Sequence, residues 1–160
     1  DLSAEMLRYG REKIERKGLS SRISLVQGDA ANLPFDDDTF DAALVAFGVR
    51  NFENLTAGLR DIGRVLRPGG RLVVLEFSTP RSAPIKPLYA WYSRHVLPRI
   101  GGALSPEQSA YEYLPRSVAA FPDGPDFLDR LEASGFTDPL WEPLTFGIAS
   151  LYRGTVPPSP

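Results

Sequence analysis

The feature that most constrains the fold is the stretch from Arg64 to Ser78, which reads RVLRPGGRLVVLEFS. Its first letters end an amphipathic helix, Pro68 stops that helix, and Gly69 and Gly70 turn the chain. The apolar run Leu72–Leu75 is too short for a helix and predicts a strand that is buried on both faces. Such strands are typical of parallel sheets covered by helices, so the stretch predicts an α/β fold.

The rest of the chain repeats this alternation of helices and strands. Helices are expected over 4–18, 54–66 and 126–134, and strands over 23–26, 40–47, 72–77, 140–145 and 148–153, the last two as a hairpin. Ser3 should cap the first helix and Gly18 should end it, with Met6, Leu7 and Ile14 facing inward. The strand, helix, strand order predicts parallel neighbours with right-handed crossovers. Ligands in such sheets bind at the carboxyl ends of the strands.

Composition excludes several classes of function. A chain of 160 residues with 42% hydrophobic residues predicts one domain with a substantial core. The formal net charge of -2 offers no attraction to nucleic acid, and we expect no such partner and no metal site. The chain has no cysteine, which suits a reducing compartment, and no apolar run near the roughly 18 residues of a membrane span. We expect a cytoplasmic location, peripheral at the membrane.

Three motifs carry a resemblance to a known family. They are LEFS at 75–78, FGVRN at 47–51 and HVLPRIG at 95–101. With the PGG turn before LEFS, the chain resembles the ubiquinone/menaquinone biosynthesis C-methyltransferases from Asp1 to about Gly154. The resemblance implies a Rossmann-like class I fold that binds S-adenosylmethionine (SAM), with a central, mostly parallel sheet flanked by helices. It also implies methylation of a polyprenyl quinol ring.

The resemblance assigns cofactor-binding roles to four residues. Asp1 matches the acidic residue that accepts hydrogen bonds from the ribose hydroxyls. Asp29 and Ala30 match the position that reads the adenine edge, through a carboxylate and a backbone amide. For Asp29 the alternative is an ordinary Asx turn after a strand. Ala46 lies where some relatives carry serine, so only backbone contact with SAM is expected there.

Arg50, Asn51 and His95 are the candidate catalytic residues on the same resemblance. Arg50 is expected to stabilise a quinol phenolate, since its pKa above about 12 makes it a poor base. Its alternative role is an ion pair with Glu53. His95, the single histidine, has a pKa suited to proton transfer, but packing among aromatic residues is the alternative. Glu76 is either another base or a residue that holds Arg50.

Residues 79–121 are expected to form a lid inserted over the strand ends, and 155–160 a disordered tail. Their aromatic residues suit a prenylated quinol and transient membrane contact, although the same side chains also suit core packing. A homodimer is a further expectation. The length of the prenyl chain and the choice between the menaquinone and ubiquinone pathways stay open.

No glycine-rich loop precedes Asp1, so the first strands and that loop of the family fold are expected to be missing. Their absence would leave unpaired backbone in the sheet, and the chain alone is expected to be inactive and to be unstable, rearranged or associated. Two other functions remain open. One is a SAM methyltransferase that acts on a different small molecule, and the other is a noncatalytic scaffold subunit of a biosynthetic assembly.

Overall fold

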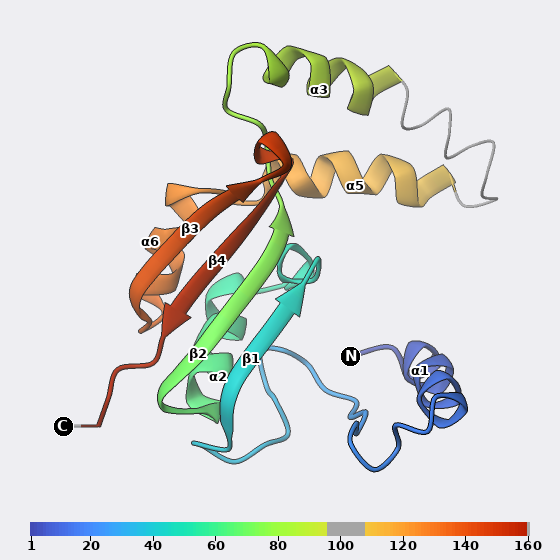
Figure 1. Ribbon diagram of the computed structural model, residues 1–160, viewed down its shortest axis with the longest axis vertical. Helices are drawn as coiled ribbons and strands as arrows, with labels where there is room; N and C mark the ends of the chain where they lie inside the picture. Colours follow the sequence, from blue (N-terminus) through green and yellow to red (C-terminus); the bar gives the residue numbers. More distant parts are fainter. Residues whose placement is uncertain (96–107, 160) are drawn as a thin grey trace.

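The computed structural model describes residues 1–95 and 108–159, with side chains described for 1–91 and 113–159. A four-stranded sheet with the order β1-β2-β4-β3 forms its centre (Figure 1). The strands are β1 (Phe40–Ala46), β2 (Leu66–Phe77), β3 (Thr137–Leu144) and β4 (Ala149–Thr155). β1 and β2 are parallel, whereas β4 runs antiparallel to both β2 and β3. The predicted α/β class and the C-terminal hairpin are confirmed, and the described sheet is mixed.

The PGG turn lies inside β2 instead of before it. α2 (Leu55–Val65) ends directly at the strand, because Leu66 already pairs with Phe40 of β1. Regular pairing resumes at Arg71, and the residues between form a bulge in which Gly69 has a φ of +78°. A backbone with this φ favours glycine.

Two helices cover one face of the sheet. α2 and α6 (Pro125–Ala133) lie on the same side of it in Figure 1. Asn54 caps α2 by accepting a hydrogen bond from the backbone N–H of Ala57 at 3.0 Å. Between these helices and the sheet lies the apolar core, which includes Leu59, Ile62, Leu66, Leu72, Val74, Phe127, Leu131 and Tyr152.

The expectation that the strand containing Leu72–Leu75 is buried on both faces is wrong, and β1 beside it is likewise covered on one face. Along β1 the side chains of Ala43 and Val45 pack on the core, whereas Leu44 between them is 79% exposed. In β2, Leu72 and Val74 are buried and Val73 is only half-buried. The reason is that no helix in the described part of the chain covers the opposite face.

α1 (Ala4–Arg16) begins and ends as predicted, but it does not pack on the sheet. Ser3 accepts a hydrogen bond from the backbone N–H of Met6 at 3.2 Å, and Gly18 has a φ of +64°. Figure 1 shows α1 beside the sheet instead of against it. Leu7 is buried, but Met6 is 60% exposed, so the expected inward position of Met6 is wrong.

The strand expected over 23–26 does not form. The hydrogen bonds of this segment's backbone run to Leu19 and to Asp1, and both Ile23 and Val26 are more than a third exposed. A strand needs a partner with which to build a ladder, and the described strands of the sheet offer none at this segment.

Of the segment expected to form a lid, the structure describes α3 (Ile85–His95) and α5 (Gln108–Ala120), which Figure 1 shows beyond the carboxyl ends of β1 and β2. The remaining short elements are η1 (Val49–Asn51) and η2 (Thr145–Gly147). Thr155 belongs to β4, and Val156 exchanges backbone hydrogen bonds with Gly69 and Gly70. These first two residues of the expected disordered tail therefore belong to the sheet.

Candidate functional site

The turn that follows β1 places its side chains beside the end of β2. Phe47 leaves the strand with a φ of +54°, and its N–H donates to the carbonyl of Leu75 at 2.8 Å. The rings of Phe47 and Phe77 lie 4.5 Å apart, centroid to centroid. This packing directs the following η1, and with it Arg50, toward the carboxyl end of β2.

Arg50 and Glu76 form a buried ion pair at this point. The Nη1 of Arg50 donates to Oε1 of Glu76 at 2.6 Å, and the backbone N–H of Arg50 donates to Oε2 at 3.3 Å. The N–H of Phe77 donates to Oε1 at 2.8 Å. The side chain of Glu76 is fully buried and that of Arg50 is 10% exposed.

Further contacts fix the guanidinium of Arg50. Nη1 also donates to the carbonyl of Phe47 at 2.7 Å, and the guanidinium carbon lies 5.5 Å from the centroid of the Phe77 ring. Arg50 is thus paired with Glu76 and not with Glu53. Because both carboxylate oxygens of Glu76 accept hydrogen bonds, this residue holds Arg50 in place.

Two contacts connect this turn to α5. Nε of Arg50 donates to Oγ of Ser117 at 3.3 Å, and the hydroxyl of Tyr113 donates to Oδ1 of Asn51 at 2.8 Å. A hollow of about 560 Å³ lies between η1 and α5, lined by Val49, Arg50, Phe52, Glu53, Leu55, Tyr113, Arg116, Ser117, Ala120, Phe121 and Pro122. The hollow joins apolar walls with two cationic side chains, those of Arg50 and Arg116, and with the acidic side chain of Glu53. This combination suits a molecule with an apolar body and an anionic oxygen.

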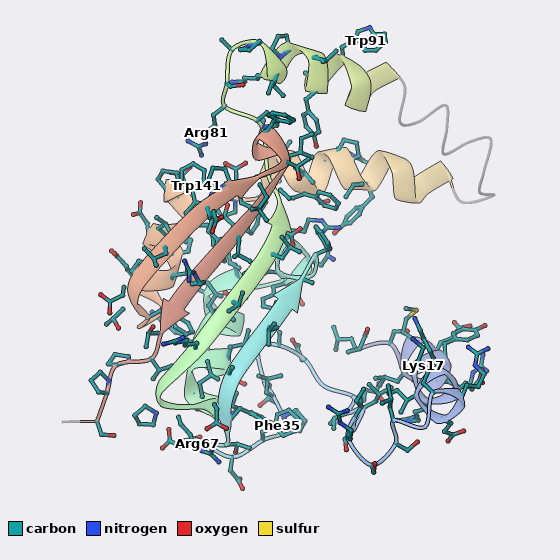
Figure 2. All side chains as sticks on the ribbon, in the orientation of Figure 1. Lys17, Phe35, Arg67, Arg81, Trp91 and Trp141 are labelled. Carbon is teal, nitrogen blue, oxygen red and sulfur yellow. The ribbon has the colours of Figure 1, made fainter. Side chains whose placement is uncertain are left out.

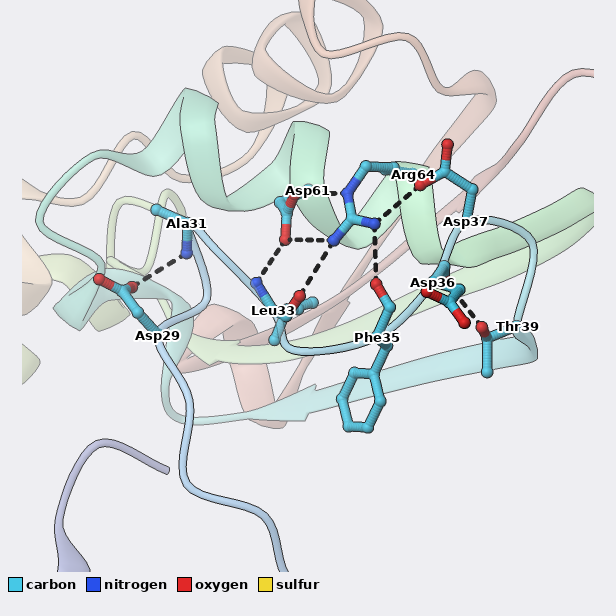
Figure 3. A network of polar contacts seen from close by, with 9 residues as sticks. All are labelled: Asp29, Ala31, Leu33, Phe35, Asp36, Asp37, Thr39, Asp61 and Arg64. Carbon is cyan, nitrogen blue, oxygen red and sulfur yellow. Dashed lines mark hydrogen bonds and ion pairs between the residues drawn. The ribbon is translucent and has the colours of Figure 1, made fainter.

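Asp29 forms the Asx turn that the sequence left as an alternative. Its Oδ1 accepts a hydrogen bond from the N–H of Ala31 at 2.9 Å (Figure 3). In the described part of the chain, neither Oδ2 of Asp29 nor the N–H of Ala30 has a hydrogen-bond partner. The turn therefore leaves one acceptor and one donor free. These are the groups that the edge of an adenine ring requires.

Asp1 lies beside this turn. Its carbonyl accepts a hydrogen bond from the N–H of Gly28 at 3.2 Å, and its Oδ1 accepts one from the N–H of Ser3 at 2.9 Å. Asp1, Asp29 and Ala30 are thus brought together. No hydrogen bond between described residues joins this group to the turn that carries Arg50 and Asn51.

The loop after Asp29 is held to α2 by Asp61 and Arg64, which the sequence analysis did not identify. Figure 3 shows both side chains reaching from the helix to the loop. A hydrogen bond from Arg64 lowers the pKa of Asp61, and the hydrogen bonds to Asp61 and Asp37 raise the pKa of Arg64. Arg64 opens the stretch 64–78, but that motif gave it only the end of a helix, and a charged pair three residues apart is common on helix surfaces.

Ala46 and His95 are the remaining sequence-predicted residues. Ala46 is the last residue of β1, and its backbone pairs with Leu75. His95 ends α3, but its side chain lies outside the described residues. The predicted role of His95 therefore stays a prediction.

A second polar cluster connects the end of β2 to the start of α6. Asp123 accepts hydrogen bonds from the N–H of Thr79 at 2.6 Å and from Arg81 at 2.8 Å. The guanidinium carbon of Arg81 lies 5.2 Å from the ring centroid of Trp141, and both side chains are labelled in Figure 2. These contacts anchor the chain where it leaves the sheet for α3.

Neither a membrane-spanning helix nor a metal-binding cluster is found within the described ranges. No helix there is long and apolar enough to cross a bilayer. No three histidine, cysteine or acidic side chains there lie close enough together to hold a metal ion.

Solved structures identify the class of fold. A SAM-dependent methyltransferase from Aquifex aeolicus superposes with a TM-score of 0.68 at 16% identity, covering 98% of this chain and 66% of the other. The [4+2]-cyclase SpnF superposes with a TM-score of 0.67 at 19% identity, covering 99% of this chain and 64% of the other. The chain therefore has the Rossmann-like fold of SAM-dependent methyltransferases.

Sequence comparison identifies the family. Residues 1–156 match the ubiE/COQ5 methyltransferase family, and the chain belongs to it. It is 45% identical over 155 residues to demethylmenaquinone methyltransferase of Bacteroides fragilis, covering 97% of this chain and 63% of that protein. It is 48% identical over 154 residues to the ubiquinone/menaquinone biosynthesis C-methyltransferase UbiE of Syntrophotalea carbinolica, covering 96% and 64%. The chain thus spans slightly less than two thirds of the length of these relatives.

Proposed function

We propose that this protein takes part in the SAM-dependent C-methylation of a polyprenyl quinol ring in menaquinone or ubiquinone biosynthesis. The observation that carries the proposal is the buried Arg50–Glu76 pair beside a hollow with apolar walls. Family membership and the names of the relatives support the same reaction. Both demethylmenaquinol and a methoxy-polyprenyl benzoquinol are candidate acceptors.

Arg50 supplies the positive charge that the acceptor needs. A quinol ring carbon becomes nucleophilic when a ring hydroxyl loses its proton and the phenolate pushes electron density into the ring. A guanidinium that stays protonated stabilises that phenolate without accepting the proton. The fully buried Glu76 fixes the orientation of Arg50, so the charge is in place before the acceptor binds.

Asp1, Asp29 and Ala30 are the residues that would hold SAM. Oδ2 of Asp29 is able to accept from the adenine amino group, and the N–H of Ala30 is able to donate to a ring nitrogen. Asp1, whose carbonyl accepts a hydrogen bond from the N–H of Gly28, would offer its carboxylate to the ribose hydroxyls. When bound, SAM would supply an electrophilic methyl group: the new C–C bond would form as the C–S bond breaks, S-adenosylhomocysteine would leave as a neutral thioether, and the proton of the ring carbon would then pass to solvent water.

The lid helices suit an acceptor that resides in a membrane. On α3, Leu88 is 64% exposed and Trp91 is 56% exposed, and Figure 2 shows Trp91 at the outer end of the molecule. Exposed leucine and tryptophan side chains favour the interface of a bilayer. This exposure supports peripheral membrane contact. Self-association as a homodimer stays a prediction.

The test is methyl transfer from isotope-labelled SAM to each of the two quinols. It uses the chain as given and the same chain extended at its amino end to the length of the curated relatives. We expect a labelled, ring-methylated product, and a loss of about a hundredfold in kcat for Arg50→Gln. Arg60→Gln, an exposed position of α2, is the matched control. Absence of product with either quinol at both lengths would refute the proposal.

A further inference from the structure

We propose that Asp61 and Arg64 are positioning residues that hold the loop 29–39 in the shape that presents Asp29 and Ala30 to the adenine ring. The inference rests on the proposed function, since it concerns the cofactor side of the same site. It assigns a role to two side chains that lie on a helix outside that site.

The loop has few hydrogen bonds of its own. Between Asp29 and Thr39 the structure contains an isolated bridge and no helix or strand. Within it, two backbone bonds form, from the N–H of Asn32 to the carbonyl of Asp29 at 3.0 Å and from that of Phe35 to the carbonyl of Leu33 at 2.8 Å. Two side-chain bonds join Ala31 to Asp29 and Thr39 to Asp36, and the N–H groups of Asp38 and Thr39 bind carbonyls at the end of α2. A loop with so few internal bonds opens easily unless other elements hold it.

Asp61 binds the loop at its middle. Oδ2 of Asp61 accepts a hydrogen bond from the N–H of Leu33 at 2.6 Å. The Asp61 side chain is only 16% exposed, so competition from water is limited. Leu33 follows Asn32, whose N–H closes the turn at Asp29. The bond to Asp61 therefore fixes the carboxyl side of the turn 29–32, and the bond from Gly28 to Asp1 fixes its amino side.

Arg64 binds the same loop at three residues, on both sides of Pro34. Nη2 donates to the carbonyl of Leu33 at 3.1 Å, and Nη1 donates to the carbonyl of Phe35 and to Oδ1 of Asp37, each at 2.8 Å. Nε donates to Oδ1 of Asp61 at 2.7 Å, which orients the guanidinium. Figure 3 shows these bonds fanning out from the planar group to the loop.

Only a guanidinium is able to make this set of contacts. Its donors lie in one plane in a fixed fork, whereas a lysine ammonium is a single point with three donors. Lysine at position 64 would keep the charge beside Asp61 and lose at least one of the two carbonyl bonds. Arg64→Lys therefore separates the effect of charge from the effect of loop geometry.

The first test is hydrogen exchange of the loop without any cofactor. In the unaltered protein the amide of Leu33 should be protected, because its proton is bonded to Asp61. Arg64→Lys and Asp61→Asn should each raise exchange of amides 31–36 by about tenfold, with α2 and β2 unchanged. Arg60→Lys, an exposed residue on the same helix, is the control. Asp37→Asn weakens only the ion pair of Arg64 with Asp37, whose side chain is 71% exposed, and should have a smaller effect on exchange.

The second test is SAM affinity and turnover in the amino-extended chain. Both variants should weaken SAM binding by about tenfold, with kcat changed less than about twofold, because the loop makes no hydrogen bond to Arg50. Unchanged exchange in both variants would overturn the inference, and so would faster exchange with unchanged affinity. If the unaltered protein binds no SAM, the proposed function fails, and the inference that rests on it falls too.

Discussion

Breaking the buried ion pair from the side of Glu76 should destabilise the protein strongly. Glu76→Gln keeps the volume of the side chain and removes its charge, which leaves the guanidinium of Arg50, only 10% exposed, without its counter-charge. Losing one partner of a buried pair costs about 3–5 kcal/mol. Because Arg50 keeps its bonds to the Phe47 carbonyl and to Ser117, we expect the lower end, about 3 kcal/mol.

Urea unfolding followed by circular dichroism measures this loss, with an unchanged m-value. The matched control is Glu12→Gln, which breaks the ion pair of Arg8 and Glu12. Its charged atoms lie 2.8 Å apart, but 56% of each side chain is exposed. The control should lose less than about 1 kcal/mol.

The double variant Arg50→Met with Glu76→Leu tests the reasoning further. Removing both charges at once leaves no unpaired ion, so it should be more stable than Glu76→Gln alone. A loss below about 1 kcal/mol in Glu76→Gln, similar to the surface control, would refute the account of a buried and mutually dependent pair.

Three further predictions concern stability. Tyr152→Phe should cost about 1–3 kcal/mol in urea unfolding, because the buried N–H of Gly124 loses its 2.7 Å acceptor; an unchanged midpoint would contradict this. Burial raises the pKa of Tyr152 above its value near 10 in the unfolded chain. The contribution of Tyr152 to folding stability is therefore complete below about pH 10 and declines as the pH rises through the pKa of the folded state, and Tyr152→Phe should lack that decline. The hydrogen bond from Arg64 lowers the pKa of Asp61 from 3.8, so the folding stability that this pair contributes is present above that pH and is lost in acid. Acid unfolding of Arg64→Met should show a shallower loss of stability, and a curve identical to that of the unaltered protein would be evidence against the pairing. Phe127→Ala should cost about 3–5 kcal/mol, because this ring is fully buried 4.7 Å from that of Tyr152; calorimetric melting that shows a loss below about 1 kcal/mol would place Phe127 outside the core.

Local patterns predicted much of the fold. The cap at Ser3, the stop at Gly18 and the helix after Asn54 all rest on side chains within a few residues of the backbone that they bind. The C-terminal hairpin was equally readable, because its two strands are neighbours in the sequence. Interactions of this kind depend little on the rest of the chain.

The predictions that the structure corrected concern contacts with distant segments. An apolar segment such as 23–26 becomes a strand only beside a partner, and its own letters do not say whether one is present. The run Leu72–Leu75 was expected to be buried on both faces because it is apolar throughout, but burial depends on which face of the sheet the helices cover, and Val73 is only half-buried. Strand formation and burial therefore depend on packing between distant segments and not on local sequence alone.

The site was predictable where a motif carried it. The FGVRN motif placed Arg50 as a candidate, and the family resemblance placed Asp29. The choice of Glu76 as the partner of Arg50 required coordinates, since Glu53 was nearer in the sequence. Arg64 was noted only as part of a helix end and Asp61 was not noted at all, because their partners are mostly backbone carbonyls and amides of a loop about 30 residues away, whose atoms every residue possesses.

The most direct test of the whole account is calorimetric titration of SAM into the chain as given and into its amino-extended form, each with and without Asp29→Ala. We expect saturable binding by the extended form and a weakening of about tenfold in the Asp29→Ala variant, which loses the carboxylate proposed to accept from adenine. Absence of binding at both lengths would contradict the cofactor assignment. Equal affinity with and without the carboxylate would contradict the proposed adenine site.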